Sequence, residues 1–176
     1  MHTALTPLDF ARRSRRLYGD REAVVEGDLR FTYREFLARC DRWSSALQRL
    51  GARRGDRIAI IAPNIHAELE AFYAVPQIGC VLVPINYRLT ADDFAYIIAH
   101  SGCRIVCARE EYLDAVDSIR DRIPQVEQFV ALDCTRPGWL DYEALLRDAP
   151  PVFAPPVPPI AEDDLITINY TSGTTA

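Results

Sequence analysis

Lysine is absent from this chain of 176 residues, and all 20 of its basic residues are arginine. The absence excludes, within these residues, any chemistry that requires a side-chain amine: a Schiff base, a desolvated lysine acting as general base, or the lysine of a Walker phosphate loop. A GC-rich coding bias that replaces lysine with arginine everywhere is the simplest explanation. The exclusion holds whatever the cause.

An excess of positive charge is also lacking, since 25 acidic residues outnumber the 20 arginines and give a formal net charge of −5. This balance argues against a general nucleic-acid binder or a polybasic membrane binder. With 49% apolar and 26% charged residues, the composition is that of a globular protein. A length of 176 residues corresponds to about one domain, which buries roughly 70% of the surface of its unfolded chain.

No apolar run is long enough to cross a bilayer. The longest nearly apolar stretch, Ala71 to Ile85, is interrupted by Gln77 and contains two prolines and a glycine, so it predicts a buried helix that leads into a buried strand. Residues 1–20 carry arginines but lack the continuous apolar core of a signal peptide, and we expect a surface helix there. The sequence predicts a soluble, cytoplasmic protein without a transmembrane segment.

Paired cysteine motifs are missing as well. The five cysteines are odd in number and contain no C-x-x-C pair, which favours a reduced, intracellular protein. His100, Cys103 and Cys107 form an H-x-x-C-x-x-x-C pattern whose alternative interpretation is a metal site. Because a helix end, a turn and a strand separate the three, we expect free cysteines that behave as small apolar side chains.

Capping signals mark two helix starts. Thr32 followed by Glu35, and Thr90 followed by Asp93, are capping boxes. The first opens a helix whose apolar residues recur at steps of four and three, which predicts one buried face: Phe36, Cys40, Trp43, Leu47 and Leu50. A glycine ends each of the two helices, Gly51 and Gly102.

Strands and helices alternate from residue 58 onward, with strand starts 23, 24 and 24 residues apart, which is typical of βαβ units. The strands are continuously apolar, as parallel strands covered on both faces should be. We therefore predict an α/β fold with a doubly wound, mostly parallel sheet, crossover helices and an N-terminal β-hairpin. The expected strands are Ile58–Ala62, Val81–Ile85, Ile105–Ala108, Phe129–Leu132 and Leu165–Tyr170, and the hairpin covers 23–31. One helix is expected over 5–18, and further helices begin after Asn64, after Thr90 and near Glu110.

Six of the twelve prolines fall between Pro150 and Pro159, which predicts a stiff, extended segment without helix. The expected organisation is an α/β subdomain over 1–148, a proline-rich linker over 149–160, and a strand with the start of a phosphate-binding loop over 161–176. Four hydroxyl residues surround one glycine in that loop: Thr171, Ser172, Gly173, Thr174 and Thr175. Hydroxyl and backbone donors at the carboxyl end of a parallel strand suit a polyanion. The pattern lacks the Walker spacing, so an ordinary polar loop is the alternative.

Residues 169–176, NYTSGTTA, resemble the start of the phosphate-loop signature of the AMP-forming superfamily of acyl-CoA synthetases, adenylation domains and luciferases, which continues there through proline, lysine and glycine. Three further stretches are similar to the family: DREAVVEGDLRFTYREF, GDRIAIIAPN and VPINYRLTADDFAYIIAHSG. The resemblance covers essentially the whole chain and implies part of a larger adenylate-forming N-terminal domain. Ala176 departs from the family's commonest glycine.

The resemblance implies an ATP-dependent ligase that activates a carboxylic acid as acyl-AMP with Mg²⁺ and transfers the acyl group to coenzyme A. It further implies that Thr171, Ser172, Gly173, Thr174 and Thr175 contact the ATP phosphates, and that Thr171 also ligates magnesium. The family's adenine-binding, acid-binding and catalytic-lysine motifs follow position 176, so this chain alone is expected to be inactive, to contain no catalytic residue and to self-associate. The alternatives are an enzyme that loads a carrier protein, or a non-catalytic α/β module.

Other polar residues receive structural interpretations. His66 has no H-E-x-x-H partner and is expected to be a surface or capping residue rather than a catalytic one. Ser172 is not in a G-x-S-x-G elbow, which disfavours a hydrolase nucleophile. The acidic pairs at 92–93 and 110–111 lie near helix starts, where they complement the helix dipole. Tyr87 and Arg88 are expected in the turn after a strand, exposed or in contact with the rest of an enzyme.

Overall fold

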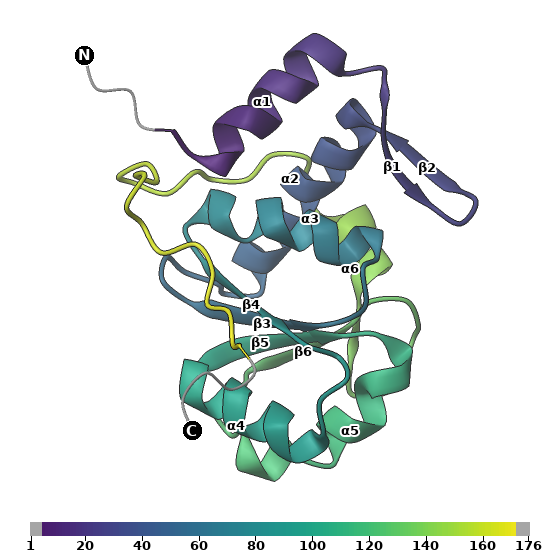
Figure 1. Ribbon diagram of the computed structural model, residues 1–176, viewed down its shortest axis with the longest axis vertical. Helices are drawn as coiled ribbons and strands as arrows, with labels where there is room; N and C mark the ends of the chain where they lie inside the picture. The colour runs from purple at the N-terminus through teal and green to yellow at the C-terminus, as the bar shows by residue number, and fades with distance from the viewer. Residues whose placement is uncertain (1–4, 172–176) are drawn as a thin grey trace.

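A computed structural model describes residues 5–171 of the chain, and it has an α/β architecture. Five parallel strands form one sheet in the order β4-β3-β5-β6-β7, between two layers of helices (Figure 1). The predicted fold class is confirmed. The strands are β3 (Arg57–Ile61), β4 (Val81–Ile85), β5 (Cys103–Ala108), β6 (Gln128–Ala131) and β7 (Leu140–Asp141).

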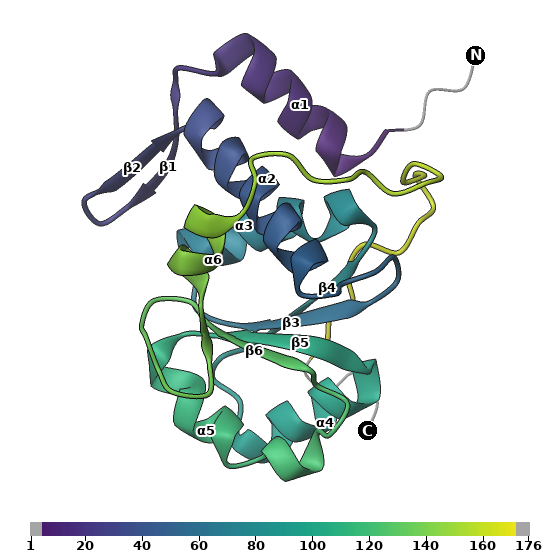
Figure 2. The ribbon, with the colours of Figure 1, turned by 180° about the vertical axis from the view of Figure 1, so that it is seen from behind.

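Helices cover both faces of this sheet, as Figures 1 and 2 show from opposite sides. One layer contains α2 (Tyr33–Arg49), α3 (His66–Ala74) and α6 (Tyr142–Asp148), with α1 (Pro7–Tyr18) packed outside it. The other layer contains α4 (Ala91–Ser101) and α5 (Leu113–Asp117). Short 3₁₀ turns occupy Pro76–Ile78, Glu110–Tyr112 and Arg120–Arg122.

The central strand β3 explains the continuous apolar pattern. Ile58 and Ile60 belong to the core under α2 and α3, whereas Ala59 and Ile61 belong to the core above α4 and α5. All four side chains are buried, because the strand's two faces are both covered. The antiparallel hairpin of β1 (Glu22–Glu26) and β2 (Leu29–Thr32) stands apart from the sheet, beside α2 and α3 (Figure 2).

The order of the strands creates a topological switch point. The chain passes from β3 to β4 on one side and then crosses β3 to add β5 on the other. Carboxyl ends of parallel strands share one edge of the sheet, and ligands of doubly wound proteins bind along that edge. The predicted phosphate loop follows a segment that reaches the same edge.

The capping signals are confirmed. The Thr32 hydroxyl accepts a hydrogen bond from the Glu35 amide, and the Thr90 hydroxyl accepts one from the Asp93 amide. Gly102 ends α4 in the left-handed conformation, with φ of 67°. The predicted helix near Glu110 is instead a 3₁₀ turn followed by the short α5.

The predicted strand Leu165–Tyr170 is wrong in its extent. Only one residue of this segment, Thr167, forms a β-bridge, to Leu82 at the outer edge of β4. The Leu82 amide donates to the Ile166 carbonyl at 3.0 Å, and the Ile168 amide donates to the Leu82 carbonyl at 2.9 Å. Side chains 165–170 are all half-buried or exposed, so the segment lacks the two-sided burial that holds the inner strands in register.

Two elements near residues 140–148 were not predicted, namely β7 and α6. The Asp141 carboxylate caps α6 by accepting from the Ala144 amide at 2.8 Å. Residues 150–159 contain neither helix nor strand, as expected, and they run along the outside of α2, where Gln48 exchanges hydrogen bonds with the backbone of Ala154. Within residues 5–171, no helix has both the length and the apolarity needed to cross a membrane.

Candidate functional site

The predicted phosphate loop begins at the carboxyl edge of the sheet. Thr171, its first residue, follows the segment that is hydrogen-bonded to β4 and is exposed. The other predicted site residues lie outside the described residues: Ser172, Gly173, Thr174 and Thr175. The structure therefore places Thr171, the first of the predicted residues, at the edge where doubly wound sheets bind ligands.

A groove of about 490 Å³ lies directly beside Thr171. The loop after β4 and the adjoining α4 line it together with Tyr170 and Thr171, so the groove joins residues far apart in the sequence. Its lining combines apolar and polar side chains: Asn86, Leu89, Asp93, Tyr96, Ile97, Tyr170 and Thr171. Thr171 lines this groove, and mixed apolar and polar walls of this kind are typical of small-molecule sites.

Two aromatic contacts anchor the chain just before the loop. The Tyr170 hydroxyl lies 2.7 Å from His100 Nδ1, and the ring of Tyr96 stacks on that imidazole with ring centroids 5.4 Å apart. Partial burial raises the pKa of Tyr170, which keeps its hydroxyl protonated. The contact of Tyr170 with His100 fixes the position of the chain just before Thr171.

The groove itself is not basic. Among the described residues that line it, none is arginine or histidine, and the only charged one is Asp93. Asp93 accepts hydrogen bonds from the Thr90 hydroxyl and amide, and these bonds lower its pKa. A carboxylate at this position occupies the α4 N-terminus and disfavours an anion there. Donors for phosphate would therefore come from Thr171 and the residues after it.

Metal ligands do not gather in the described part of the chain, where no group of three or more His, Cys, Asp or Glu side chains is placed to hold an ion. Cys103 and Cys107 lie in the cores on opposite faces of β5, which a register shift in that strand permits. The cysteines are free, and His100 is occupied by Tyr170.

A second cavity of about 350 Å³ lies between β1 and α3, and it contains His66. His66 was expected to be a surface or capping residue; it is the first residue of α3, as a helix-start position requires, but its side chain is only 14% exposed. Its Nδ1 lies 2.8 Å from the Glu26 carboxylate, and its Nε2 lies 3.7 Å from Glu143. Glu143 and Glu26 raise the pKa of His66, and the same imidazole, with Arg39, lowers the pKa of Glu143 to about 2.

Sequence reasoning missed the charged network behind this cavity. Glu70 has no exposed surface, receives hydrogen bonds from Arg39 (Nε to Oε1, 2.5 Å) and from the Tyr142 hydroxyl, and its burial raises its pKa. Arg39 also donates to Glu143. The sequence contained a signal for the burial of Glu70, because Glu70 lies at helical spacing with the buried Ala67, Ala71 and Ala74.

The remaining polar candidates have structural roles. Asp92 pairs with Arg122 at 2.5 Å, and the Glu110 amide donates to Asp133 at 2.8 Å. Arg88 lies over the ring of Tyr87, with its guanidinium carbon 5.5 Å from the ring centroid. Arg109 follows β5 at the switch point; its amide donates to the Ile61 carbonyl at the end of β3, and its Nε pairs with Asp133 at 2.7 Å.

Known proteins identify the fold and the family. The family model described as "AMP-binding enzyme" matches residues 10–176. The chain is 36% identical to 4-hydroxybutyrate–CoA ligase 2 of Metallosphaera sedula, covering 99% of this chain and 33% of that protein. It is also 36% identical to the long-chain-fatty-acid–CoA ligase of Thermus thermophilus, covering 99% and 32%.

Solved structures agree with these sequence relatives. A putative long-chain-fatty-acid CoA ligase of Rhodopseudomonas palustris superposes with a TM-score of 0.87 at 32% identity, covering 96% of this chain and 42% of that one. The anthranilate CoA ligase AuaEII, in complex with anthranoyl-AMP, superposes with a TM-score of 0.93 at 22% identity, covering 100% and 34%. The chain spans about a third of the length of the curated relatives that it matches. It belongs to the AMP-binding enzyme family.

Proposed function

We propose that this chain forms the N-terminal part of an AMP-forming acyl-CoA synthetase, which activates a carboxylic acid with ATP and passes the acyl group to coenzyme A. The match of the family model over residues 10–176 carries this proposal. The relatives are named as CoA ligases, which supports coenzyme A as the acceptor of the acyl group. A cytoplasmic location is part of the proposal, supported by the free cysteines.

The proposed role of residues 171–175 is to hold the ATP phosphates. Thr171 starts this loop at the carboxyl edge of the sheet, beside the groove of about 490 Å³. Hydroxyl and backbone N–H donors fixed there would face the charge that builds on the departing pyrophosphate. The oxygen of Thr171 suits a hard cation, and Mg²⁺ when bound neutralises phosphate charge. Residues 1–148, 149–160 and 161–176 act as subdomain, linker and loop-bearing segment in this proposal.

A hybrid protein tests the proposal. In it, this chain replaces the corresponding first third of the Thermus thermophilus ligase, and folding is verified by circular dichroism. We expect the hybrid to catalyse ATP–pyrophosphate exchange that depends on a carboxylic acid, and the chain alone to catalyse none. Thr174→Ala should reduce the exchange by about 100-fold, the usual effect of losing one donor to developing charge.

The matched control is Thr167→Ala, which removes a hydroxyl from the same segment before the loop. Its exchange should equal that of the unaltered hybrid. A folded hybrid without exchange, or a Thr174→Ala hybrid with full exchange, contradicts the proposal. Assays with coenzyme A and with an acyl-carrier protein distinguish the ligase from an enzyme that loads a carrier.

A further inference from the structure

The outward side of α1 combines exposed apolar side chains with arginines. Phe10, Arg13 and Leu17 recur at steps of three and four residues and so share one side of the helix. Phe10 is 62% exposed and Leu17 is 50% exposed, although both are large apolar side chains. Arg16 lies beside this row and is also exposed. We call these four residues the outer face of α1.

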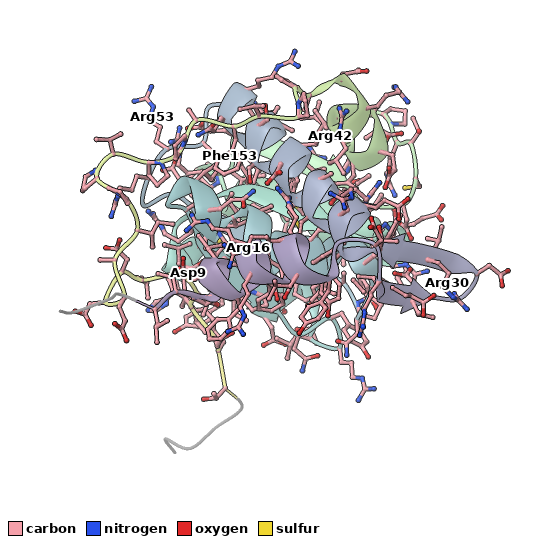
Figure 3. The ribbon with its side chains drawn as sticks, turned by 90° about the horizontal axis from the view of Figure 1, so that it is seen from above. Asp9, Arg16, Arg30, Arg42, Arg53 and Phe153 are labelled. Carbon is pink, nitrogen blue, oxygen red and sulfur yellow. The ribbon has the colours of Figure 1, made fainter. Side chains whose placement is uncertain are left out.

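The opposite side of α1 is fixed to the protein. Leu8 is buried, and Ala11 packs against the main core. Arg15 reaches α2, where its Nη1 lies 2.8 Å from the Asp41 carboxylate. Figure 3, a view from above, shows α1 lying across the top of the molecule. The outer face therefore points away from the core in a defined orientation, and it cannot be buried by rotation of the helix.

The charge of this segment differs in sign from that of the whole chain. Residues 5–21 contain five arginines and two aspartates, whereas the chain as a whole carries −5. Arg12 is paired with Asp9 at 3.0 Å. Within residues 5–171, no carboxylate lies within 4.0 Å of the Arg13 or Arg16 guanidinium. These two cations are free to bind an external anion, a local property that the net charge conceals.

The composition of the outer face and its place outside the neighbouring cavities indicate the kind of partner. The two cavities that border α1 are lined by its inner and lateral residues, such as Leu8, Ala11 and Arg12. None of the four outer-face residues lines either cavity. The face therefore lies outside both cavities, and an exposed helix side that combines apolar and basic side chains suits the surface of an anionic bilayer.

We propose that α1 docks the chain on an anionic lipid bilayer. Phe10 and Leu17 enter the boundary between head groups and acyl chains, and Arg13 and Arg16 bind lipid phosphates. The contact is peripheral, because only one side of a twelve-residue helix takes part while the other remains packed on the protein. Its strength depends on salt, since the attraction of exposed charges is screened within about 10 Å at 0.1 M salt.

Co-sedimentation of the chain with vesicles tests the proposal, with a lipid-free sample subtracted. We expect binding to vesicles of phosphatidylcholine mixed with phosphatidylglycerol, and much weaker binding to phosphatidylcholine alone or in high salt. Each arginine near an anionic surface contributes roughly fivefold to binding, so Arg13→Ala with Arg16→Ala should lower the partition coefficient by roughly 25-fold. Phe10→Ser with Leu17→Ser should also weaken binding.

Matched controls remove similar groups elsewhere on the surface. Arg53 is exposed and lies well apart from Arg16 in Figure 3, so Arg53→Ala should bind like the unaltered chain. Val152, 75% exposed in the proline-rich segment, supplies the apolar control as Val152→Ser. Equal binding to the two kinds of vesicle overturns the proposal. So does an Arg13/Arg16 double variant that binds like Arg53→Ala, and so does an absence of binding to the vesicles that contain phosphatidylglycerol.

Discussion

At the residue scale, Glu70 is a fully buried carboxylate that needs a counter-charge or hydrogen-bond donors inside the protein. Its charge is balanced by Arg39, which comes from a different helix. Burial of an ion pair stabilises little by itself, but removing one partner leaves a charge without compensation in a medium of low polarity. The two partners should therefore be strongly interdependent.

We predict that Arg39→Met lowers the free energy of unfolding by about 3 to 5 kcal/mol, because Glu70 loses its cation while remaining buried. Adding Glu70→Gln to this variant should restore much of the loss, since a neutral amide does not need a counter-charge. Urea denaturation measures both changes. The control on the same helix is Arg34→Met: Arg34 pairs with Asp20 at 2.9 Å in an exposed position, and its loss should cost at most about 1 kcal/mol.

A small effect of Arg39→Met, equal to that of Arg34→Met, would show that Glu70 is already neutral in the folded protein. The raised pKa that burial gives Glu70 makes this outcome a real alternative, and the pH dependence of the loss would reveal it.

Local signals were readable from the sequence, whereas the partner of Glu70 was not. Thr32, Thr90 and Gly102 act on residues within a few positions, so their spacing alone predicts their roles. Arg39 and Glu70 are 31 residues apart in the sequence, and Tyr142 is 72 residues beyond Glu70. Only the packing of α2, α3 and α6 brings the three together, and α6 itself was not predicted.

At the element scale, the junction of α4 and β5 depends on Gly102. Its φ of 67° is costly for residues with a side chain, and a Cβ built there would lie 2.6 Å from Arg57 Nη2. That guanidinium donates to the carbonyls of Gly102 and Ser101, both at 2.8 Å, and so satisfies the end of α4.

We predict that Gly102→Ala lowers the free energy of unfolding by about 2 kcal/mol or more, because the positive φ is disfavoured and Arg57 must leave its carbonyl partners. Gly27→Ala is the matched control, since Gly27 also has a positive φ, of 54°, but no neighbour within 4 Å of the added Cβ. It should lose only about 1 kcal/mol. If Gly102→Ala and Gly27→Ala lose equal free energies of unfolding, in thermal or urea unfolding, the hydrogen bonds of Arg57 contribute nothing to the cost of Gly102→Ala.

Elements with strong periodicity were predicted well, and marginal ones were not. The strand Val81–Ile85 has the predicted bounds because its apolar run is continuous and flanked by turn residues. The segment 165–170 alternates apolar and polar residues from Ile166 onward and forms a single bridge, since an edge position supplies hydrogen bonds from one side only. That the segment lies at the edge of the sheet is not visible in its residues, because its place depends on the packing of the other strands.

At the scale of the whole molecule, the regular spacing of strands was enough to predict a parallel sheet. The ligand loop that the resemblance implies at Thr171 stays a prediction. The groove beside Thr171 was not predictable, because it joins the loop after β4, α4 and Tyr170. His100 was weighed as a metal ligand in the sequence, whereas in the structure it clamps Tyr170. Both the groove and the contact between His100 and Tyr170 depend on residues that are far apart in the sequence.

The outer side of the segment beside β4 has consequences for the isolated chain. Tyr96, 62% exposed, lies in the groove beside Thr171, and Leu165, 61% exposed, lies on the segment that borders β4. Within residues 5–171, that segment has no strand neighbour on its outer side. An uncovered strand edge with apolar side chains is a template for pairing with another copy.

We predict that the chain self-associates through this edge, with an apparent mass that rises with concentration in multi-angle light scattering. Leu165→Lys should reduce the association, because a charge on an edge segment opposes pairing with a second copy. Val152→Lys is the control: Val152 is 75% exposed but lies in the proline-rich segment, which has no free ladder of hydrogen-bonding groups, so this change should leave the mass unaltered. A monodisperse monomer at high concentration would contradict the self-association. Equal effects of the two lysines would show that the added charge acts through the net charge of the chain and not at this edge.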